Sequence, residues 1–236
     1  MRSPVTRHLI PRAALGAALG VALLAGALPG QVTTVDEGSF TISRDGQTVG
    51  REEFTIRSTP GAGGAHFVAR GTVSYTDRRL APALSADSAG APLQYQVEVK
   101  SGTETEEMLS GKVGRGRFSA RIQTPKGESA REYIVADGAL IIDDDVFHQY
   151  FFLARADRAG TVPVVVPRRN VQLSMQVSQQ GEEQLSIGGR VLPARRLLLT
   201  EPGGATRDVW VDARGRVLKV SIPARGVVAV RDDPPK

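Results

Sequence analysis

The stretch Leu93-Gln-Tyr-Gln-Val-Glu-Val-Lys100 decides the fold class of this chain. Its apolar side chains stand at every second position, and polar side chains fill the positions between them. A repeat of two residues places the apolar set on one face of an extended strand and the polar set on the other. The same alternation returns at Val171–Ser178 and at Leu218–Ile222. Such strands are typical of antiparallel sheets with one face in the core and one in water.

Short turn signals separate these strands. The clearest are Asp45-Gly46, Gly188-Gly189, Pro202-Gly203-Gly204 and Arg214-Gly215. Glycine adopts the left-handed backbone conformations that tight hairpins need. The sequence therefore predicts an all-β protein, built as an antiparallel curved sheet or incomplete barrel. Because no linker divides residues 28–236, we expect them to form a single antiparallel β domain.

One segment breaks the two-residue repeat. The residues that share one helical face in this segment are Phe147, Tyr150, Phe151 and Ala154. Three aspartates, Asp143 to Asp145, come before them, and an aspartate at a helix start can accept hydrogen bonds from the free N–H groups of the first turn. This pattern predicts one short helix over residues 145–156, capped by an aspartate and packed against the sheet.

The N-terminus has the pattern of a secretory signal peptide. Arg2, Arg7 and Arg12 precede an uncharged run of Ala, Gly, Leu and Val from Ala13 to Ala27, which ends in small residues. This run is shorter than the roughly 20 residues that a membrane-spanning helix needs. We therefore interpret residues 1–27 as a signal peptide and expect a periplasmic or secreted protein that does not span the membrane.

Composition excludes several classes of function. The chain carries a formal charge of +5, but the first 27 residues hold three arginines and no acidic residue, which leaves +2 for the remainder. Nucleic acid binding calls for a concentrated basic face, and none stands out, so we expect no nucleic acid partner. The chain has no cysteine. Its fold must therefore be held by its core without disulfides.

Aromatic residues gather in the predicted helix. Four of the chain's Phe and Tyr residues lie within six positions: Phe147, Tyr150, Phe151 and Phe152. Together with Trp210, the only tryptophan, they could line a cavity for an apolar ligand between the helix and the sheet. The alternative is that these side chains fill the core, as a lone helix on a sheet requires, and that Trp210 packs within a central strand.

The sequence offers little for catalysis or for metal binding. Beyond the leader the only histidines are His66 and His148, and no Gly-x-Ser-x-Gly or His-Glu-x-x-His motif occurs. The carboxylates of Glu52 and Glu53 would point to opposite faces of a strand. Asp143 to Asp145 with His148 match no zinc or calcium loop. We expect no enzyme, no metal site and no cofactor.

Three arginines, Arg115, Arg117 and Arg121, are predicted to share one strand face opposite Phe118 and Ile122. They could meet an anionic lipid head or another polyanion. Alternatively, they form a solvated outer face with acidic partners on the next strand.

Two stretches resemble exported bacterial half-barrel proteins of unknown function. Asp208-Val-Trp-Val-Asp-Ala-Arg-Gly-Arg-Val-Leu-Lys-Val220 resembles their late hairpin, and Gly38–Phe54 resembles their opening hairpin. The fold of these families resembles that of the LolA/LolB-like periplasmic lipoprotein carriers, an incomplete antiparallel barrel with a helical lid. The resemblance implies carriage or sensing of an acyl chain in the envelope.

Three functions remain open at this point. The leading hypothesis is an exported protein that binds an apolar or acyl-chain ligand between the sheet and the helix. The alternative is a cell-envelope interaction module with a filled core, which would use an exposed strand edge or the arginine stripe. A metal-dependent or hydrolytic enzyme comes third. A cavity of several hundred cubic ångströms between sheet and helix would separate the first two.

Overall fold

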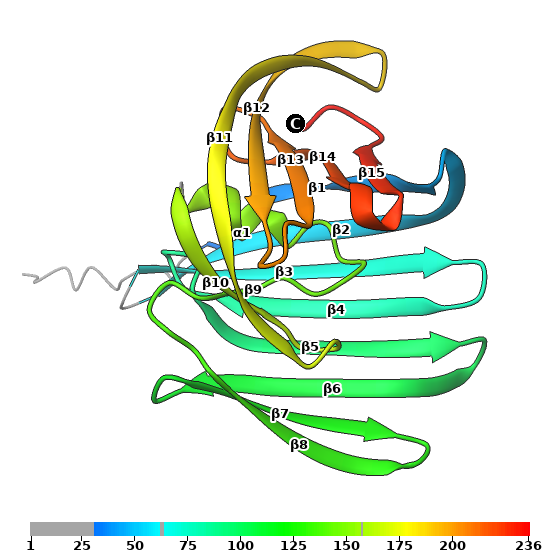
Figure 1. The fold of residues 1–236 in the computed structure, drawn as a ribbon, viewed down its shortest axis with the longest axis vertical. Helices are drawn as coiled ribbons and strands as arrows, with labels where there is room; N and C mark the ends of the chain where they lie inside the picture. The colour runs from blue at the N-terminus through cyan, green and yellow to red at the C-terminus, as the bar shows by residue number, and fades with distance from the viewer. Residues whose placement is uncertain (1–30, 62–63, 157) are drawn as a thin grey trace, which may run out of the picture.

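A computed structural model describes residues 31–61, 64–156 and 158–236 of the chain (Figure 1). The predicted signal peptide, residues 1–27, lies outside the described residues. Every strand of the described part belongs to one sheet of 15 strands.

The bounds of the strands are β1 Thr33–Arg44, β2 Gln47–Gly61, β3 Gly64–Tyr75, β4 Arg79–Ala86, β5 Pro92–Ser101, β6 Glu104–Gly114, β7 Arg117–Thr124, β8 Gly127–Ile134, β9 Leu140–Ile141, β10 Gly160–Val166, β11 Val171–Ile187, β12 Arg190–Thr200, β13 Thr206–Val211, β14 Val217–Ile222 and β15 Val227–Arg231. Consecutive strands form hairpins from β1 to β8 and from β10 to β15. The order across the sheet is β8-β7-β6-β5-β4-β3-β2-β1-β15-β14-β13-β12-β11-β10-β9.

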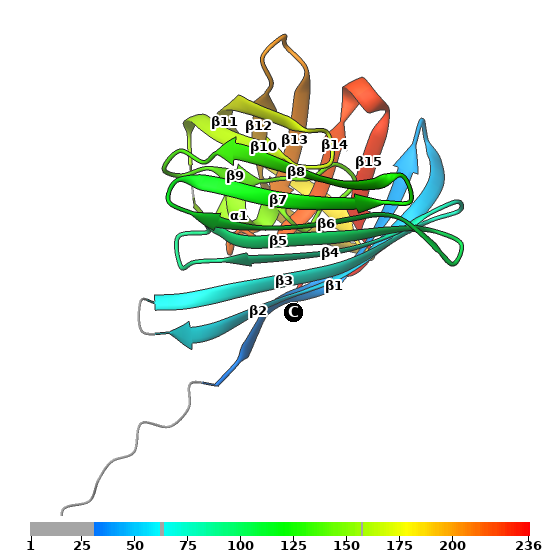
Figure 2. The same ribbon diagram turned by 90° about the horizontal axis from the view of Figure 1, so that it is seen from below.

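The sheet is strongly curved and stays open. Figures 1 and 2 show β1–β8 and β10–β15 as two parts of one curved surface, which face each other across the core. The edges are β8 and β9, which pair with β7 and β10 but not with each other. Within the described residues only β9 and β10 pair in parallel. The predicted fold class, an antiparallel curved sheet with one short helix, is confirmed.

The core lies on the concave face, where alternate residues point inward. In β5 the side chains of Tyr95, Val97 and Val99 are buried, whereas Gln96 between them is exposed. The same alternation places Phe40 and Ile42 of β1 in the core, at 0% exposure. Each Å² of apolar surface that is buried stabilises the folded state by roughly 25 cal/mol. In a chain without disulfides, this burial is the main source of stability.

The α-helix is shorter than predicted. α1 spans Tyr150–Arg155 and is the only α-helix among the described residues, whereas the sequence predicted 145–156. Asp145 has a left-handed backbone with φ of 66°, which interrupts any helix that begins there. The amides of Tyr150, Phe151 and Phe152 bond to carbonyls three residues earlier, so the chain enters α1 through a tight turn. Gln149 stands at the N-cap and makes no side-chain cap.

A second, smaller apolar cluster covers the convex side of β13 and β14. It consists of Ile187, Ala194, Trp210 and Leu218. The long hairpin of β11 and β12 arches over this side, as Figure 1 shows in yellow and orange. Trp210 donates its indole N–H to Glu183 at 2.8 Å. The neighbours Val209 and Val211 point to the main core, so Trp210 faces away from it.

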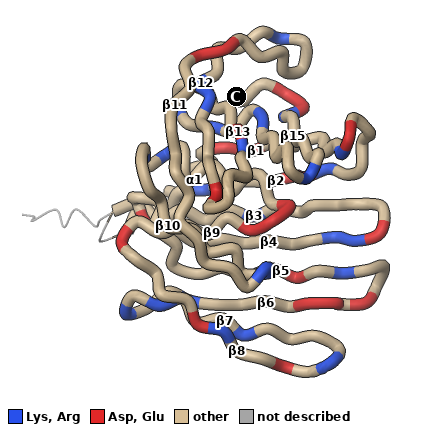
Figure 3. Tube along the Cα trace, viewed as in Figure 1, with Lys and Arg blue, Asp and Glu red and all other residues tan. Residues whose placement is uncertain are grey.

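The arginine stripe is only partly formed. Arg115 lies in the turn before β7 with φ of 52°, and not on the strand. Arg117 pairs with Glu132 at 2.9 Å, and Arg121 pairs with Glu128 at 2.8 Å, both across to β8. Figure 3 shows residues of both signs on β7 and β8, which agrees with a solvated outer face. In the described part of the chain, no helix is long and apolar enough to cross a membrane.

Candidate functional site

The concave face of the sheet is covered by one connection, from Ala139 to Ala154, which we call the plug. It contains β9 and most of α1. All of its residues are buried except Asp144, which is partly exposed. A connection that passes through a core must satisfy its polar groups inside the protein. The contacts that the plug makes for this purpose form the candidate site.

The aromatic residues of the plug pack into a filled core. Phe147, Tyr150, Phe151 and Phe152 are each 1% exposed. The rings of Phe151 and Phe152 lie 5.4 Å apart, edge to face, and each also contacts Phe67 of β3, at 6.2 and 6.4 Å. The structure thus brings four of the five predicted ligand-lining residues together. It places Trp210, the fifth, on the opposite face of the sheet.

A buried carboxylate on β2 holds the plug just before α1. Oε2 of Glu52 accepts the backbone N–H of Phe147 at 2.8 Å, and Oε1 lies 2.5 Å from Nδ1 of His148. Both side chains are fully buried. The ring of Phe54 stacks on the imidazole with centroids 5.6 Å apart. A Cβ on Gly71 would lie 2.9 Å from the imidazole Cε1, so only glycine leaves room for His148 there.

The position of Glu52 in the sequence pattern indicates burial, although a charged residue is normally expected at the surface. Glu52 lies in phase with Phe54 and Ile56, two residues that face the core. An acidic residue in phase with the apolar face of a strand must have a buried partner. His148, 96 positions away, could not be identified as that partner from spacing alone.

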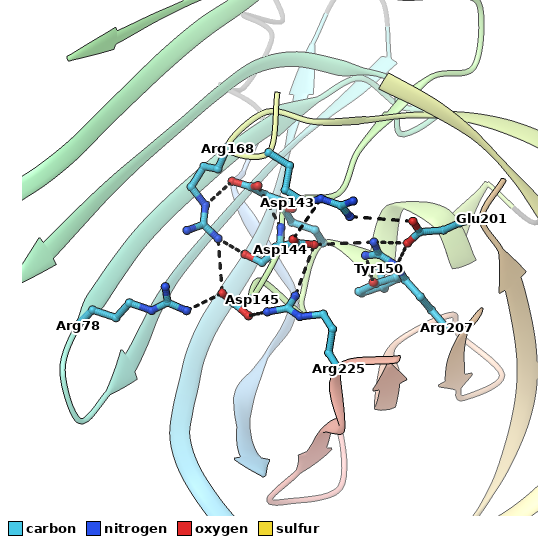
Figure 4. Close-up of polar contacts among 11 residues, drawn as sticks. Arg78, Asp143, Asp144, Asp145, Tyr150, Arg168, Glu201, Arg207 and Arg225 are labelled. Atoms are coloured by element: carbon cyan, nitrogen blue, oxygen red, sulfur yellow. Dashed lines mark hydrogen bonds and ion pairs between the residues drawn. The ribbon is translucent and has the colours of Figure 1, made fainter. Parts of the chain in front are cut away.

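The outer two aspartates of the plug bind arginines and do not cap α1 (Figure 4). Asp143 accepts hydrogen bonds from Tyr95 at 2.8 Å and from Arg168 at 2.9 Å. Asp145 accepts from Arg78 at 2.8 Å and from Arg225 at 2.6 Å. Burial raises the pKa of Asp143, although Arg168 opposes this shift. The predicted capping role was wrong because the arginines occupy these carboxylates.

Asp144, the middle aspartate, is differently placed. Its carboxylate lies among three guanidinium groups, at 3.5 Å from Arg225, 3.7 Å from Arg207 and 3.8 Å from Arg169. Oδ1 is buried, and no hydrogen bond to it is found among the described residues. The carboxylate of Asp144 therefore forms ion pairs with these arginines without a hydrogen bond to its Oδ1, whereas its backbone carbonyl accepts a hydrogen bond from Arg168 (Figure 4).

The arginines reach this point from separate connections at one rim of the sheet. Arg78 precedes β4, Arg168 and Arg169 lie between β10 and β11, and Arg207 is the second residue of β13. Arg225 ends the short 3₁₀ helix η1, Pro223–Arg225, between β14 and β15. No sequence spacing connects these positions, so sequence reasoning missed the cluster.

A pocket of about 340 Å³ opens beside Asp144, and we call it the rim pocket. It is lined by Asp144, Arg169, Glu201, Ala205, Thr206, Arg207, Ile222, Ala224 and Arg225. Arg207 is buried, and each of its three guanidinium nitrogens donates a hydrogen bond. It donates to Glu201 at 2.8 and 2.5 Å and to the hydroxyl of Tyr150 at 2.9 Å. Burial raises the pKa of Tyr150, so its hydroxyl is neutral at physiological pH and accepts this bond.

Comparison with known proteins gives the fold and no activity. No protein-family model matches the chain, and no curated protein matches it. A beta-barrel-like protein of the domain of unknown function DUF1849 from Brucella abortus matches with a TM-score of 0.54 and 9% identity, covering 84% of this chain and 95% of that one. A DUF1089 family protein from Pseudomonas aeruginosa matches with a TM-score of 0.38 and 14% identity, covering 89% and 97%. The first likeness shows a shared barrel-like fold, which does not define function; the second is too distant to support an argument.

Proposed function

We propose that this chain is an exported interaction module of the cell envelope, which acts through its surface and rim and does not enclose an apolar ligand. Export is supported by the leader pattern of residues 1–27. The observation that carries the rest is the filled core. The four aromatic residues of the plug occupy the space between sheet and helix, and each is 1% exposed.

The acyl-carrier hypothesis requires a different core. A ligand between the sheet and α1 would have to separate Phe151 from Phe152, or from Phe67, which both of them contact. It would also lose Trp210 as a lining residue, because Trp210 faces the convex side. The rim pocket is of suitable volume, but charged side chains dominate its lining. Ligand pockets for apolar molecules are lined mainly by apolar side chains.

An enzymatic function has equally little support. His148 is buried and paired with Glu52, so a substrate could not reach it without removal of the plug. His66 is exposed on β3 near the hairpin to β2. Asp143 and Asp145 already bind arginines, which a metal ion would have to displace.

Native mass spectrometry of the protein purified from its own envelope tests the proposal. For an interaction module with a filled core, we expect the measured mass to equal that of the polypeptide alone. We also expect no binding of a fluorescent fatty-acid probe. A retained lipid, or saturable probe binding that Phe151→Ala weakens, would establish the carrier hypothesis in its place.

A further inference from the structure

We propose that the rim pocket binds a phosphate group between the guanidinium groups of Arg169 and Arg225. This inference concerns a different part of the molecule from the filled core. It holds whether or not the chain is exported.

Arg169 is the first donor. Its Nε lies 3.8 Å from Oδ2 of Asp144, and its Nη1 lies 4.0 Å from Oε2 of Glu201. Both distances exceed a hydrogen bond, and no hydrogen bond from Arg169 to another described residue is found. Its side chain is 42% exposed. A guanidinium group with unused N–H donors therefore lies at the wall of the pocket.

Arg225 is the second donor. Its Nη2 is bonded to Asp145, but its Nη1 is buried and has no hydrogen-bond partner among the described residues. This atom forms an ion pair with Oδ1 of Asp144 at 3.5 Å, and that oxygen also lacks a hydrogen-bond partner among the described residues. Leaving a charged donor unsatisfied is costly, so an acceptor atom in the pocket would be stabilised there.

The charges of the pocket favour an anion. Its lining holds three guanidinium groups and two carboxylates, which leaves one positive charge in excess. Glu201 accepts hydrogen bonds from two nitrogens of Arg207, and the third nitrogen of Arg207 donates to Tyr150. Arg225 is also bonded to Asp145, so the excess positive charge lies at Arg169, whose ion-pair partners Asp144 and Glu201 are 3.8 and 4.0 Å away.

The number of donors favours phosphate over carboxylate. A single guanidinium fork can occupy both oxygens of a carboxylate, whereas phosphate has further oxygens for a second fork. Arg169 and Arg225 come from different connections. Arg169 provides a whole fork, and Arg225 provides its Nη1, because its Nη2 is bonded to Asp145. The volume of about 340 Å³ also leaves room for a small group attached to the phosphate. The phosphate could belong to a soluble phosphate ester or to a lipid headgroup.

Calorimetric titration of the whole protein with inorganic phosphate, at neutral pH and physiological salt, tests the inference. We expect saturable binding by the wild type that is at least roughly tenfold weaker in Arg169→Gln, because charge-assisted hydrogen bonds are lost. Because Arg169 makes no hydrogen bond to the described residues, this substitution removes none of them, and the variant should remain folded. Arg121→Gln is the matched control, since it removes an equal charge from an exposed side chain on the distant strand β7.

The outcomes separate a site from a structural ion cluster. Equal weakening in Arg121→Gln, equal binding by all three proteins, or no binding by the wild type would each overturn the inference. Sedimentation with vesicles then identifies the source of the phosphate. Binding to phosphatidylglycerol vesicles that requires Arg169 indicates a lipid headgroup, and calorimetric binding without vesicle binding indicates a soluble phosphate.

Discussion

Nδ1 of His148 lies 2.5 Å from Oε1 of Glu52, and neither side chain has any exposed surface. The other oxygen of Glu52 holds the amide of Phe147. One carboxylate on β2 therefore fixes the plug at two consecutive residues, Phe147 and His148, just before α1. Loss of this carboxylate would leave the amide of Phe147 and Nδ1 of His148 buried without their hydrogen-bond partner, and each unsatisfied buried polar group is costly.

Replacement of Glu52 should therefore be strongly destabilising. We expect Glu52→Ala to lower the free energy of unfolding by about 3 kcal/mol or more. Glu53→Ala is the matched control, because Glu53 is the next residue and its side chain is 71% exposed. The control should change stability by no more than about 0.5 kcal/mol. Urea midpoints measure both, and similar values for the two variants would contradict the assigned role of Glu52.

Phe151→Ala tests whether the core is filled. Phe151 is 1% exposed and contacts Phe67 and Phe152. Its truncation should cost about 3–5 kcal/mol, as in a tight core. Val191→Ala, at an apolar residue that is 66% exposed, should stay within about 0.5 kcal/mol. A loss near 1 kcal/mol for Phe151→Ala would indicate a cavity that ligand or water can fill.

Asp143 should make the protein less stable as the pH rises. Burial raises its pKa in the folded state above the value of about 3.9 in the unfolded chain. Between about pH 4 and the raised pKa, the folded state therefore binds more protons than the unfolded state. The contribution of Asp143 to the free energy of unfolding falls across that pH range. The unfolding free energy of the wild type, relative to that of Asp143→Asn, should decrease as the pH rises from about 4. If this relative free energy of the wild type instead increases with pH, Arg168 has a larger effect than burial on the pKa of Asp143.

The leader pattern predicts a processed N-terminus. Residues 25–27 provide the small side chains that signal peptidases recognise, and Leu28 with Pro29 can move the cut a few residues on. N-terminal sequencing of the mature protein should begin between Leu28 and Thr33. Recovery of Met1 from exported protein would remove the basis for an envelope location.

The sequence predicted the fold well, because a two-residue repeat is a local property. The face of β5 that carries Tyr95, Val97 and Val99 is the buried face. The helix was predicted too long, because Asp145 was expected to cap it and instead turns left-handed to reach Arg78 and Arg225.

The candidate site could be predicted only in part, because it depends on contacts between distant residues. The aromatic side chains of the plug were found since they lie together in the sequence. Trp210 was grouped with them, although the convex side of the sheet has an apolar cluster of its own. The rim arginines come from separate connections, and only the curvature of the sheet brings them to Asp144.

The place of β1 in the sheet has a consequence for how the protein folds. β1 pairs with β2 on one side and with β15 on the other, and Asp36 bonds to Arg231 across 195 positions of sequence. The middle of the chain forms the sheet's edges, and its two ends meet in the interior. The hairpins can form locally and early, whereas the β1–β15 ladder joins strands far apart in the sequence and must form after them. A chain that stops short of Val227 would be left as two half-sheets, with β1 and β14 unpaired at their inner edges.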